Sequence, residues 1–324
     1  MLITSEVYKN LYHYTTWDGL SGILNSGNLR ATHYKFLNDY SEITLFRDRL
    51  VRLILPYVQK QYEELIKRSP HAKSEIDKEG GLFLAVQHDS EAFVNAQYNA
   101  TGDEIYIASF CGEHSDAYVN SNGLLSQWRG YGAGGGYALV FDTKKLEETL
   151  WLEVNNYEYG MIQLSDVVYS EDDEKLQEEF SDDLSSIAED VEKVFSHMIA
   201  PDNELALSGY RPFVSCISRY KHYGFREEHE VRIVALPSLV NSELMELASN
   251  GHTTLKPEKE RKIRTKSDGF VPYIELFDSP KIELPITKII VGPHREKESR
   301  AAALRVMLRH TDIEIQCSTI PFAG

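Results

Sequence analysis

The chain has 324 residues, 42% of them hydrophobic, and its 50 acidic and 34 basic side chains give a formal net charge of −16. This length and hydrophobic fraction allow a full core in one large domain or two smaller ones. The acidic balance disfavours non-specific binding of nucleic acid, which needs many phosphate contacts, but it does not exclude a local basic cleft. Three widely separated cysteines, no leader-like opening and no run of about 18 apolar residues indicate a cytoplasmic protein without disulfides, structural zinc or a membrane span.

The first predicted elements are a strand and a helix. Residues 10–16 alternate and are rich in aromatic and β-branched side chains, which favours a strand. Thr15 or Thr16 can cap a following helix, an apolar stripe recurs there at helical spacing, and Gly27 can end it. The elements predicted beyond that helix are, in chain order, an extended segment at 28–33, helices at 40–67 and 82–98, strands at 104–111, 137–141 and 166–169, helices at 171–198 and 211–223, strands at 230–236, 271–277 and 287–291, a helix at 296–310 and a strand at 313–317.

Strands and helices alternate along the whole chain, and no internal repeat is present. This order predicts the α+β class and a single domain over 1–324, with helical insertions near 40–100 and 171–223. The least ordered segments are expected at 112–123 and 237–267.

The segment from Ser126 to Asp142 is the most informative stretch of the sequence. It places Trp128, Arg129 and Tyr131 just ahead of a glycine run that leads into a buried strand. Glycine permits close backbone approach to a ligand, arginine neutralises phosphate, and aromatic faces stack on rings. We therefore interpret the segment as a nucleotide site, with a flexible β-hairpin turn as the alternative. It matches neither a GxGxxG before a helix nor a P-loop.

Two distant motifs add candidate site residues. His13 lies in the first predicted strand, where it is either a hydrogen-bonded histidine bracing the strand–helix corner or a ligand of a ribose hydroxyl. Glu228 and Glu230 lie two apart on a predicted strand and so share a face with Arg232. Carboxylates this close raise each other's pKa unless a cation pairs with them. A ligand site and a salt bridge to Arg232 or Arg226 are therefore both open.

Other polar segments have structural interpretations. Asn38, Asp39 and Glu42 are interpreted as helix-capping residues, and the acidic residues between 165 and 193 first as a solvated helical face and second as a partner-binding surface. No HExxH, EF-hand loop or GxSxG occurs, so we expect neither a metal site nor a hydrolase triad.

Taken together, the motifs resemble those of a bacterial family called domain of unknown function 2971. The shared motifs are Tyr12–Thr15, Leu37–Asp39, Ser126–Gly132, Glu228–Arg232, Ile289–Pro293 and Ser318–Phe322. The likeness therefore spans nearly the whole chain.

At longer range the order of the motifs is similar to that of the ADP-ribosyltransferase superfamily. His13, followed by a helix and Gly27, resembles the opening of the branches that modify DNA or remove phosphate from RNA. The stretch Gly132–Phe141 resembles the glycine-led strand of the poly-ADP-ribose polymerases, and Glu228–Glu230 resembles the Glu-x-Glu of arginine-modifying toxins. The resemblance implies a split β-sandwich core and NAD as a co-substrate.

The same resemblance implies roles for individual residues. Glu230 would stabilise positive charge on the ribose, Glu228 would orient or deprotonate the acceptor, and His13 would hold the adenosine-side ribose. Tyr131 or Tyr137 would stack on nicotinamide, and Arg129 would meet the diphosphate. The residues expected to bind NAD are His13, Tyr14, Thr15, Ser126, Trp128, Arg129, Tyr131, Gly132 and Tyr137.

The implied activity is mono-ADP-ribosylation by a toxin or antiphage effector, with an antitoxin or other inhibitory partner. The acceptor stays open, since the context of His13 favours nucleic acid whereas the Glu-x-Glu and the acidic charge favour protein. Three alternatives remain: an NAD glycohydrolase, a non-catalytic nucleotide sensor or scaffold, and a metal-dependent nuclease using Asp39, Glu228 and Glu230.

Overall fold

The computed structural model describes residues 3–37, 41–101, 104–132, 134–199, 210–238, 255–266, 269–280 and 282–321. The chain forms two compact units. Unit 1 consists of Met1–Phe36, Ile105–Val167 and Arg226–Gly324, and unit 2 of Leu37–Glu104 and Val168–Phe225. Unit 2 corresponds to the two segments in which the sequence predicts helical insertions. The single domain over 1–324 stays a prediction.

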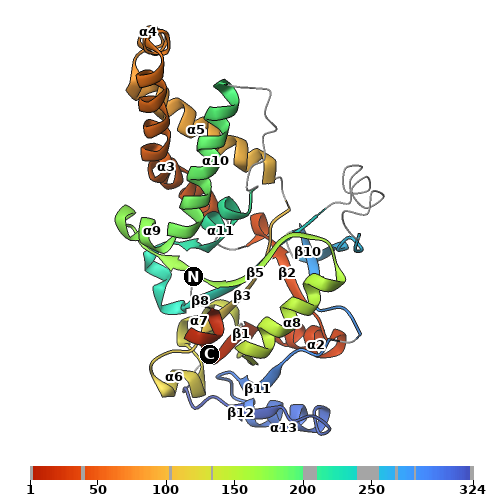
Figure 1. The fold of residues 1–324 in the computed structure, drawn as a ribbon. Coiled ribbons are helices and arrows are strands. Elements are labelled where there is room, and N and C mark those ends of the chain that lie inside the picture. The colour runs from red at the N-terminus through yellow and green to blue at the C-terminus, as the bar shows by residue number, and fades with distance from the viewer. Residues whose placement is uncertain are drawn as a thin grey trace. The chain divides into compact units, whose positions relative to one another are not determined.

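Unit 1 contains a ten-stranded sheet with helices beside it (Figure 1). Its strands are β1 (Asn10–Thr15), β2 (Leu29–His33), β3 (Tyr106–Gly112), β4 (Tyr137–Asp142), β5 (Tyr159–Asp166), β8 (Glu230–Pro237), β9 (Arg261–Lys266), β10 (Gly269–Leu276), β11 (Ile286–Val291) and β12 (Glu314–Cys317). Its described helices are α1 (Thr4–Val7), α2 (Trp17–Ser26), α6 (Ala117–Asn122), α7 (Leu125–Tyr131), α8 (Thr143–Asn156) and α13 (Lys297–Met307), with a 3₁₀ helix η1 at Tyr34–Phe36. β11 and β12 are parallel and the other described pairs of this sheet are antiparallel, so the sheet is mixed, in keeping with the predicted α+β class.

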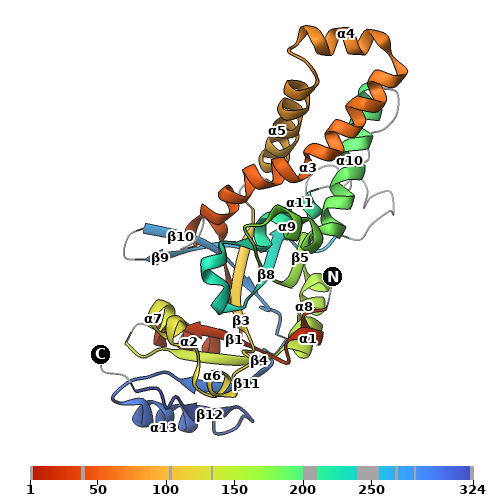
Figure 2. The same ribbon diagram turned by 90° about the vertical axis from the view of Figure 1, so that its left-hand side faces the viewer.

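The sheet forks at β3. One edge of β3 pairs with β8 from Tyr106 to Cys111, and β8 pairs in turn with β5. The other edge is shared, because β2 pairs with Tyr106 and Ile107 whereas β1 pairs with Cys111 and Gly112. Beyond β1 lie β4, β11 and β12, and beyond β2 lie β10 and β9, so two wings diverge from one strand (Figure 2).

The pairing register assigns each side chain to one of two faces, because residues opposite one another in neighbouring strands point the same way. We call these the Leu11 face and the Tyr12 face. The Leu11 face carries the main core, to which α2, α8 and α13 contribute Leu20, Leu146 and Leu304. The Tyr12 face carries a smaller cluster that includes Trp128 of α7. Burial of each such side chain stabilises the fold by about 1.5–3 kcal/mol.

The strand and helix predicted at the start of the chain are confirmed. The side chain of Thr16 caps α2 by accepting a hydrogen bond from the Gly19 amide, which satisfies a donor that the helix itself leaves unpaired. Gly27 ends α2 in the left-handed region, with φ of 71°, where glycine has no Cβ to clash. Leu20 and Ile23 of the predicted stripe are buried.

Unit 2 is mainly helical. Its elements are α3 (Ser41–Arg68), α4 (Pro70–Lys78), α5 (Leu82–Thr101), α9 (Asp173–Glu179), α10 (Ser181–Ile199), α11 (Arg211–Arg219) and a parallel pair of short strands, β6 (Val168–Tyr169) and β7 (Tyr220–Lys221). Val58 of α3, Val86 of α5 and Val191 of α10 form one buried cluster. The predicted break at Ser69 is confirmed, since Ser69 caps α4 and α3 ends one residue before it.

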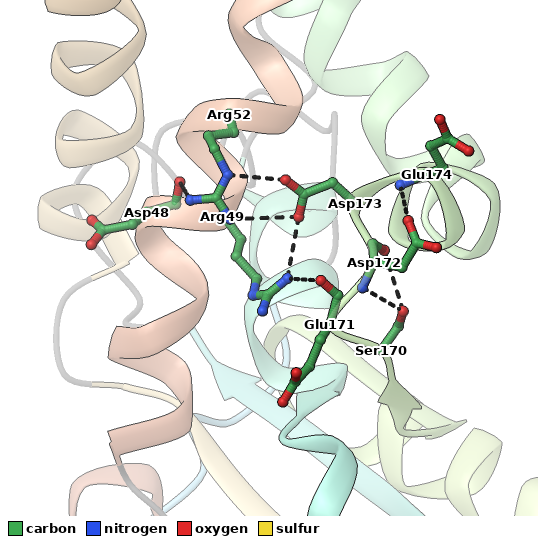
Figure 3. Close-up of polar contacts among 8 residues, drawn as sticks. All are labelled: Asp48, Arg49, Arg52, Ser170, Glu171, Asp172, Asp173 and Glu174. Atoms are coloured by element: carbon green, nitrogen blue, oxygen red, sulfur yellow. Dashed lines mark hydrogen bonds and ion pairs between the residues drawn. The ribbon is translucent and has the colours of Figure 1, made fainter.

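Two arginines of α3 hold the start of α9 (Figure 3). Arg52 Nε lies 2.9 Å from Asp173 Oδ2, and Arg49 Nη1 lies 3.2 Å from Asp173 Oδ1 and donates to the Glu171 carbonyl at 2.7 Å. The hydrogen bond from Arg52, with the two arginine charges, lowers the pKa of the Asp173 carboxyl. Both guanidinium groups therefore have an anionic partner within unit 2.

Four predicted boundaries are wrong. Segment 112–123 contains α6, which Asp116 caps through the Tyr118 amide. Segment 237–267 includes strand β9, so the expectation is wrong for that part, whereas residues 239–254 and 267 lie outside the described residues. The strand expected at 166–169 is instead the end of β5 followed by the two-residue β6.

The fourth wrong boundary is the end of the helix predicted at 211–223. α11 ends at Arg219 because the next two residues pair with β6. Asn38 and Asp39, interpreted as caps, lie outside the described residues. No helix in the described ranges has the length and apolarity needed to cross a membrane.

Candidate functional site

A small hollow opens on the Tyr12 face of unit 1, where β1 meets the end of β3. It measures about 260 Å³, open solvent included. Its lining combines phenol, thiol, imidazole and carboxylate side chains with a few apolar ones: Tyr12, Tyr14, Cys111, Gly112, His114, Val119, Asn120, Leu124, Glu227 and Glu228. We call this the Tyr14 hollow. Most of this space is open to solvent, since the enclosed part is only about 10 Å³, close to what one water needs. The hollow is therefore a shallow depression that can contact part of a ligand but does not enclose a ring, a sugar or a dinucleotide.

Tyr14 is fixed in place by α7 and by the loop before it. Its hydroxyl accepts a hydrogen bond from the Leu124 amide at 2.8 Å, and its ring stands edge-on to Trp128 with centroids 4.9 Å apart. Trp128 is itself buried and donates from Nε1 to the Asn122 carbonyl at 3.0 Å. Trp128 thus supports Tyr14 from behind, and its own ring is not presented to a ligand.

Burial keeps the phenols of this hollow protonated. It raises the pKa of Tyr12 to about 12, with a smaller contribution from the nearby charge of Glu113. Burial also raises the pKa of Tyr14, against the effect of its hydrogen bond from Leu124. Both hydroxyls therefore act as neutral hydrogen-bonding groups at neutral pH rather than as bases.

Two histidines lie beside the hollow with their rings stacked. The centroids of His114 and His229 are 5.1 Å apart and the ring planes differ by 21°. His114 Nδ1 accepts a hydrogen bond from the Asp116 amide at 3.1 Å, which leaves the proton of the neutral ring on Nε2. His229 has a positive φ of 43°, uncommon for a residue other than glycine, and backbone strain of this kind gathers at functional sites.

The strained His229 separates the two glutamates that the sequence places on one strand. Glu228 belongs to a 3₁₀ helix, η2 (Tyr223–Glu228), and β8 begins only at Glu230. The prediction that Glu228 shares a strand face with Glu230 is therefore wrong, because the turn at His229 interrupts the alternation. Glu228 is half-buried and lines the hollow.

Glu230 is engaged elsewhere. It is buried and forms a two-pronged pair with Arg232, at 2.8 Å to Nε and 3.0 Å to Nη2. This is the salt bridge left open as the alternative, and the prediction that these two residues share a face is confirmed. Glu230 nevertheless stands directly opposite Cys111, a lining residue, so the pair forms part of the wall behind the hollow.

His13 lies on the opposite face of the sheet. It faces Leu139 across β4, whereas Tyr12, Cys111 and Glu230 form one row on the other side. Its Nδ1 is 2.9 Å from the Ser109 carbonyl, at the point where β3 has lost a strand partner to the fork, and burial lowers its pKa. The histidine therefore braces the fork as a neutral donor, and it does not meet Glu230.

The glycine run packs against main chain rather than forming an open cradle. A Cβ on Gly136 would lie 2.4 Å from Gly132 Cα, and one on Gly135 would lie 2.7 Å from the Pro293 carbonyl. Arg300 of α13 also donates to the Gly134 carbonyl at 3.0 Å. These glycines allow α7, β4 and the segment after β11 to approach closely, which accounts for them without a ligand.

The remaining residues expected to bind NAD are scattered. Ser126, Trp128, Arg129 and Tyr131 lie on α7, a helix where the sequence suggested a turn. Ser126 Oγ is buried with no hydrogen-bond partner among the described residues, and Arg129 is exposed.

Two more of these residues lie on the Leu11 face. Thr15 pairs with Tyr137 across β1 and β4, and the register places both with His13. Tyr137 is buried with its ring 5.8 Å from Trp17. Of the nine expected residues, Tyr14 alone is part of the described lining of the hollow, with Trp128 behind it.

Sequence reasoning missed Cys111, His114 and Glu227. Cys111 occupies the β3 position opposite Tyr12, and that pairing is not readable from a single sequence. His114 follows β3 directly, where polar residues at a strand end can mark a site. Across the described part of the chain, no three side chains of His, Cys, Asp or Glu are placed to hold a metal ion.

The fold and the hollow define an α+β protein built on a forked, open mixed sheet. Residues 127–233 match the model of a family described as "Protein of unknown function (DUF2971)". The matched stretch runs from α7 to β8 and includes Trp128, Glu228 and Glu230, so it contributes to the hollow. Neither the curated proteins nor the solved structures compared with the chain gave a match.

Proposed function

We propose that the protein is an NAD-consuming mono-ADP-ribosyltransferase whose reaction takes place at the Tyr14 hollow. One observation carries the proposal: Tyr14, near the start of the chain, and Glu228, from its last third, line one hollow beside the fork of the sheet. A sheet that divides at one strand is compatible with the split β-sandwich implied by the resemblance to ADP-ribosyltransferases. Water as the acceptor, or binding without reaction, are the alternatives that the experiment below separates.

Within this proposal we give the carboxylate role to Glu228 rather than to Glu230. NAD supplies a nicotinamide–ribose bond that breaks with positive charge developing on the sugar, as in glycoside hydrolysis. A carboxylate facing the ring stabilises that charge. Glu228 lines the hollow, whereas the charge of Glu230 is already matched by Arg232. Glu230 acts instead as a positioning residue that fixes the β8 end.

The other lining groups are of the kinds that contact a ring and a sugar at the mouth of the hollow. The Tyr12 and Tyr14 phenols are neutral hydrogen-bonding groups, and Tyr14 is held rigidly by Leu124 and Trp128. Rigid aromatic walls orient a flat ring such as nicotinamide at low entropic cost. The stacked His114 and His229 stand near Glu228 and can pass a proton from an acceptor hydroxyl or amine to solvent.

The test is incubation with NAD labelled in its adenylate phosphate, together with separate pools of protein, RNA and DNA. Wild type should label one pool and release nicotinamide in equal amount. Glu228→Gln should lower the rate by about 10²-fold or more, because one preorganised charged group is lost. Glu148→Gln on α8, an exposed carboxylate away from the hollow, is the matched control and should keep full activity.

Three results would contradict the proposal in different ways. Free ADP-ribose with no labelled pool would identify an NAD glycohydrolase. Binding of NAD without nicotinamide release would identify a nucleotide sensor. Full activity of Glu228→Gln with loss in Glu230→Gln would return the catalytic role to Glu230.

A further inference from the structure

Two arginines of unit 1 stand exposed on one face of the sheet, and the described part of the chain supplies neither with a counter-ion. Arg30 lies on β2 and Arg264 on β9, the two strands that pair with β10. Neither forms an ion pair or a hydrogen bond with any described residue. Both guanidinium groups are therefore available to an anion from outside the chain.

The pairing register places Arg30 and Arg264 on the same face of the sheet, on either side of Tyr273. Arg30 is opposite Glu275 and Arg264 is opposite Val271, and Tyr273 lies between those two positions on β10. The Arg30 guanidinium lies over the Tyr273 ring at 4.9 Å from its centroid. Burial, followed by the positive charge of Arg30, lowers the pKa of Arg264, which shows that the two charges are close enough to repel.

The carboxylate that could neutralise Arg30 is taken by other residues. Glu275, directly opposite Arg30, accepts hydrogen bonds from Lys262 Nζ at 2.7 Å and from Asn28 Nδ2 at 3.3 Å. Glu260 contacts Lys262 at 3.3 Å. Among the described residues, Glu275 and Glu260 thus pair with Lys262 rather than with the two arginines, whose guanidinium groups can meet an anionic ligand.

Protection of an edge strand does not explain the pair. β9 is the last strand of its wing, and charged side chains on edge strands discourage pairing with other molecules. Arg30, however, lies on β2, which has β3 on one side and β10 on the other, so it protects no edge.

We propose that Arg30 and Arg264 form a binding strip for the phosphate backbone of a single-stranded nucleic acid. Arginine pairs bind phosphate oxygens through several charge-assisted hydrogen bonds at once. A guanidinium that lies over an aromatic ring still offers its outer face to an unpaired base, which a single strand supplies and a duplex does not. The backbones of β2 and β9 are two strand spacings apart, about 10 Å, and the partners of Arg30 and Arg264 on β10 are four residues, about 13 Å, apart. The two long side chains can therefore reach two separate phosphates of one strand.

The strip lies on the same face of the sheet as the Tyr14 hollow. Thr32, two residues after Arg30 on β2, is opposite Ile107, and the alternation of β3 places Ile107 with Cys111. If the function proposed above holds, the bound strand is the acceptor of the ADP-ribosyl group. Binding by the strip is nevertheless measured without NAD, so the two proposals fail separately.

The experiment is fluorescence anisotropy with labelled 20-nucleotide RNA, the matching DNA and a 20-base-pair duplex, over a series of salt concentrations and without NAD. Wild type should bind the single strands more tightly than the duplex. Arg30→Gln and Arg264→Gln should each weaken binding by about tenfold and lower the slope of log K against log salt by about 0.7, the value for one single-strand phosphate contact. Comparison of the RNA and DNA arms identifies the sugar that is preferred.

The matched control is the double variant Lys144→Gln with Arg309→Gln, two exposed cations of unit 1 outside the strip. It has the same net charge as Arg30→Gln with Arg264→Gln. A difference in binding between the two double variants therefore reports where the charges lie and not how many were removed. Equal losses of affinity for single strands in the two double variants would overturn the proposal that Arg30 and Arg264 form a binding strip. Displacement of RNA by NAD at the strip, or tighter binding of a phosphopeptide than of either single strand, would overturn it as well.

Discussion

Unit 1 and unit 2 each contain a cluster of ion-paired side chains, and the two clusters differ in burial. In unit 1, Lys259 is 1% exposed, with Nζ 2.6 Å from Glu153 Oε1 and 2.8 Å from Asp278 Oδ1. In unit 2, Asp173 is 40% exposed and meets Arg49 and Arg52 (Figure 3). Water screens the charges of the second cluster and is excluded from the first. The attraction between opposite charges is therefore stronger in the first cluster than in the second.

The difference shows why charge patterns in a sequence are hard to interpret. Lys259 lies in the charge run 258–262, which reads as a solvated loop. The structure places its ammonium over the Tyr157 ring, 3.8 Å from the centroid, and between two carboxylates. Glu153 also accepts hydrogen bonds from the Tyr159 hydroxyl and the Phe277 amide, so every group in this cluster depends on the others.

The largest expected effect follows from removing the buried cation. Lys259→Met leaves Glu153, which is 0% exposed, without a counter-charge, and breaking such a pair costs about 3–5 kcal/mol of unfolding free energy. Urea unfolding followed by circular dichroism measures it.

Lys256→Met is the control for Lys259→Met. Lys256 is three residues away and donates to the Val154 carbonyl at 2.8 Å in a partly buried position, so its loss should cost no more than about 1.5 kcal/mol. Equal losses of unfolding free energy in Lys259→Met and Lys256→Met would show that the deeper burial of Lys259 does not make its contacts more stabilising.

A second, smaller effect distinguishes the two glutamates near His229. Glu230→Gln breaks the buried pair with Arg232 and should lower the unfolding free energy by about 2–3 kcal/mol, the range for a hydrogen bond to a charged group. Glu228→Gln should change it by less than about 1 kcal/mol, because Glu228 is half-buried at the hollow. If Glu228→Gln destabilised the protein as much as Glu230→Gln, its assignment to the site would lose its basis.

Much of the fold was predictable because its signals are local. The Thr16 cap, the Gly27 stop and the break at Ser69 each act within a few residues, so β1, α2 and α3 follow from the sequence. α7 was missed because the interpretation of Ser126–Asp142 centred on its glycine run. Gly132 and Gly136 lie beyond α7 and serve close packing with other segments. That packing is a long-range property and leaves no local pattern.

The candidate site was predictable only in part, for the same reason. Of the residues selected from the sequence, Tyr14 and Glu228 line the hollow, whereas His13 is directed to the opposite face by the alternation of β1. Which face of β1 meets the end of β3 depends on strand pairing across the chain. The positive φ at His229, which moves Glu228 off the strand, is equally invisible in the sequence.

A third effect concerns a buried group that stays uncharged. His13→Leu removes the donor to the Ser109 carbonyl and should cost about 1–2 kcal/mol at pH 7.5. The folded His13 has a pKa below the ordinary 6.5, so below pH 6.5 the unfolded chain binds the extra proton and wild type loses stability as the pH falls.

Urea unfolding of wild type and His13→Leu at pH 7.5, 6.5 and 5.5 checks the sign of this effect, with those values chosen around the ordinary pKa of 6.5. The difference in unfolding free energy between wild type and His13→Leu should become smaller as the pH falls, because the variant has no imidazole to protonate at this position. A gap that widened instead would mean that His13 is stabilised in its charged form, contrary to its burial at the fork.

The smallest effect belongs to the exposed cluster of unit 2. Asp173→Asn removes the anion shared by Arg49 and Arg52, and an exposed pair of this kind contributes about 0.2–1 kcal/mol. Because the folded pKa of Asp173 lies below the ordinary 3.8, the contribution is present above pH 3.8 and is lost as the pH falls through the folded value. Urea unfolding in about 1 M salt, where the screening length shrinks to about 3 Å, should remove most of it, while the loss caused by Lys259→Met should persist. A loss of several kcal/mol for Asp173→Asn, unaffected by salt, would mean that solvent does not reach this cluster, and burial would no longer explain the contrast between the two units.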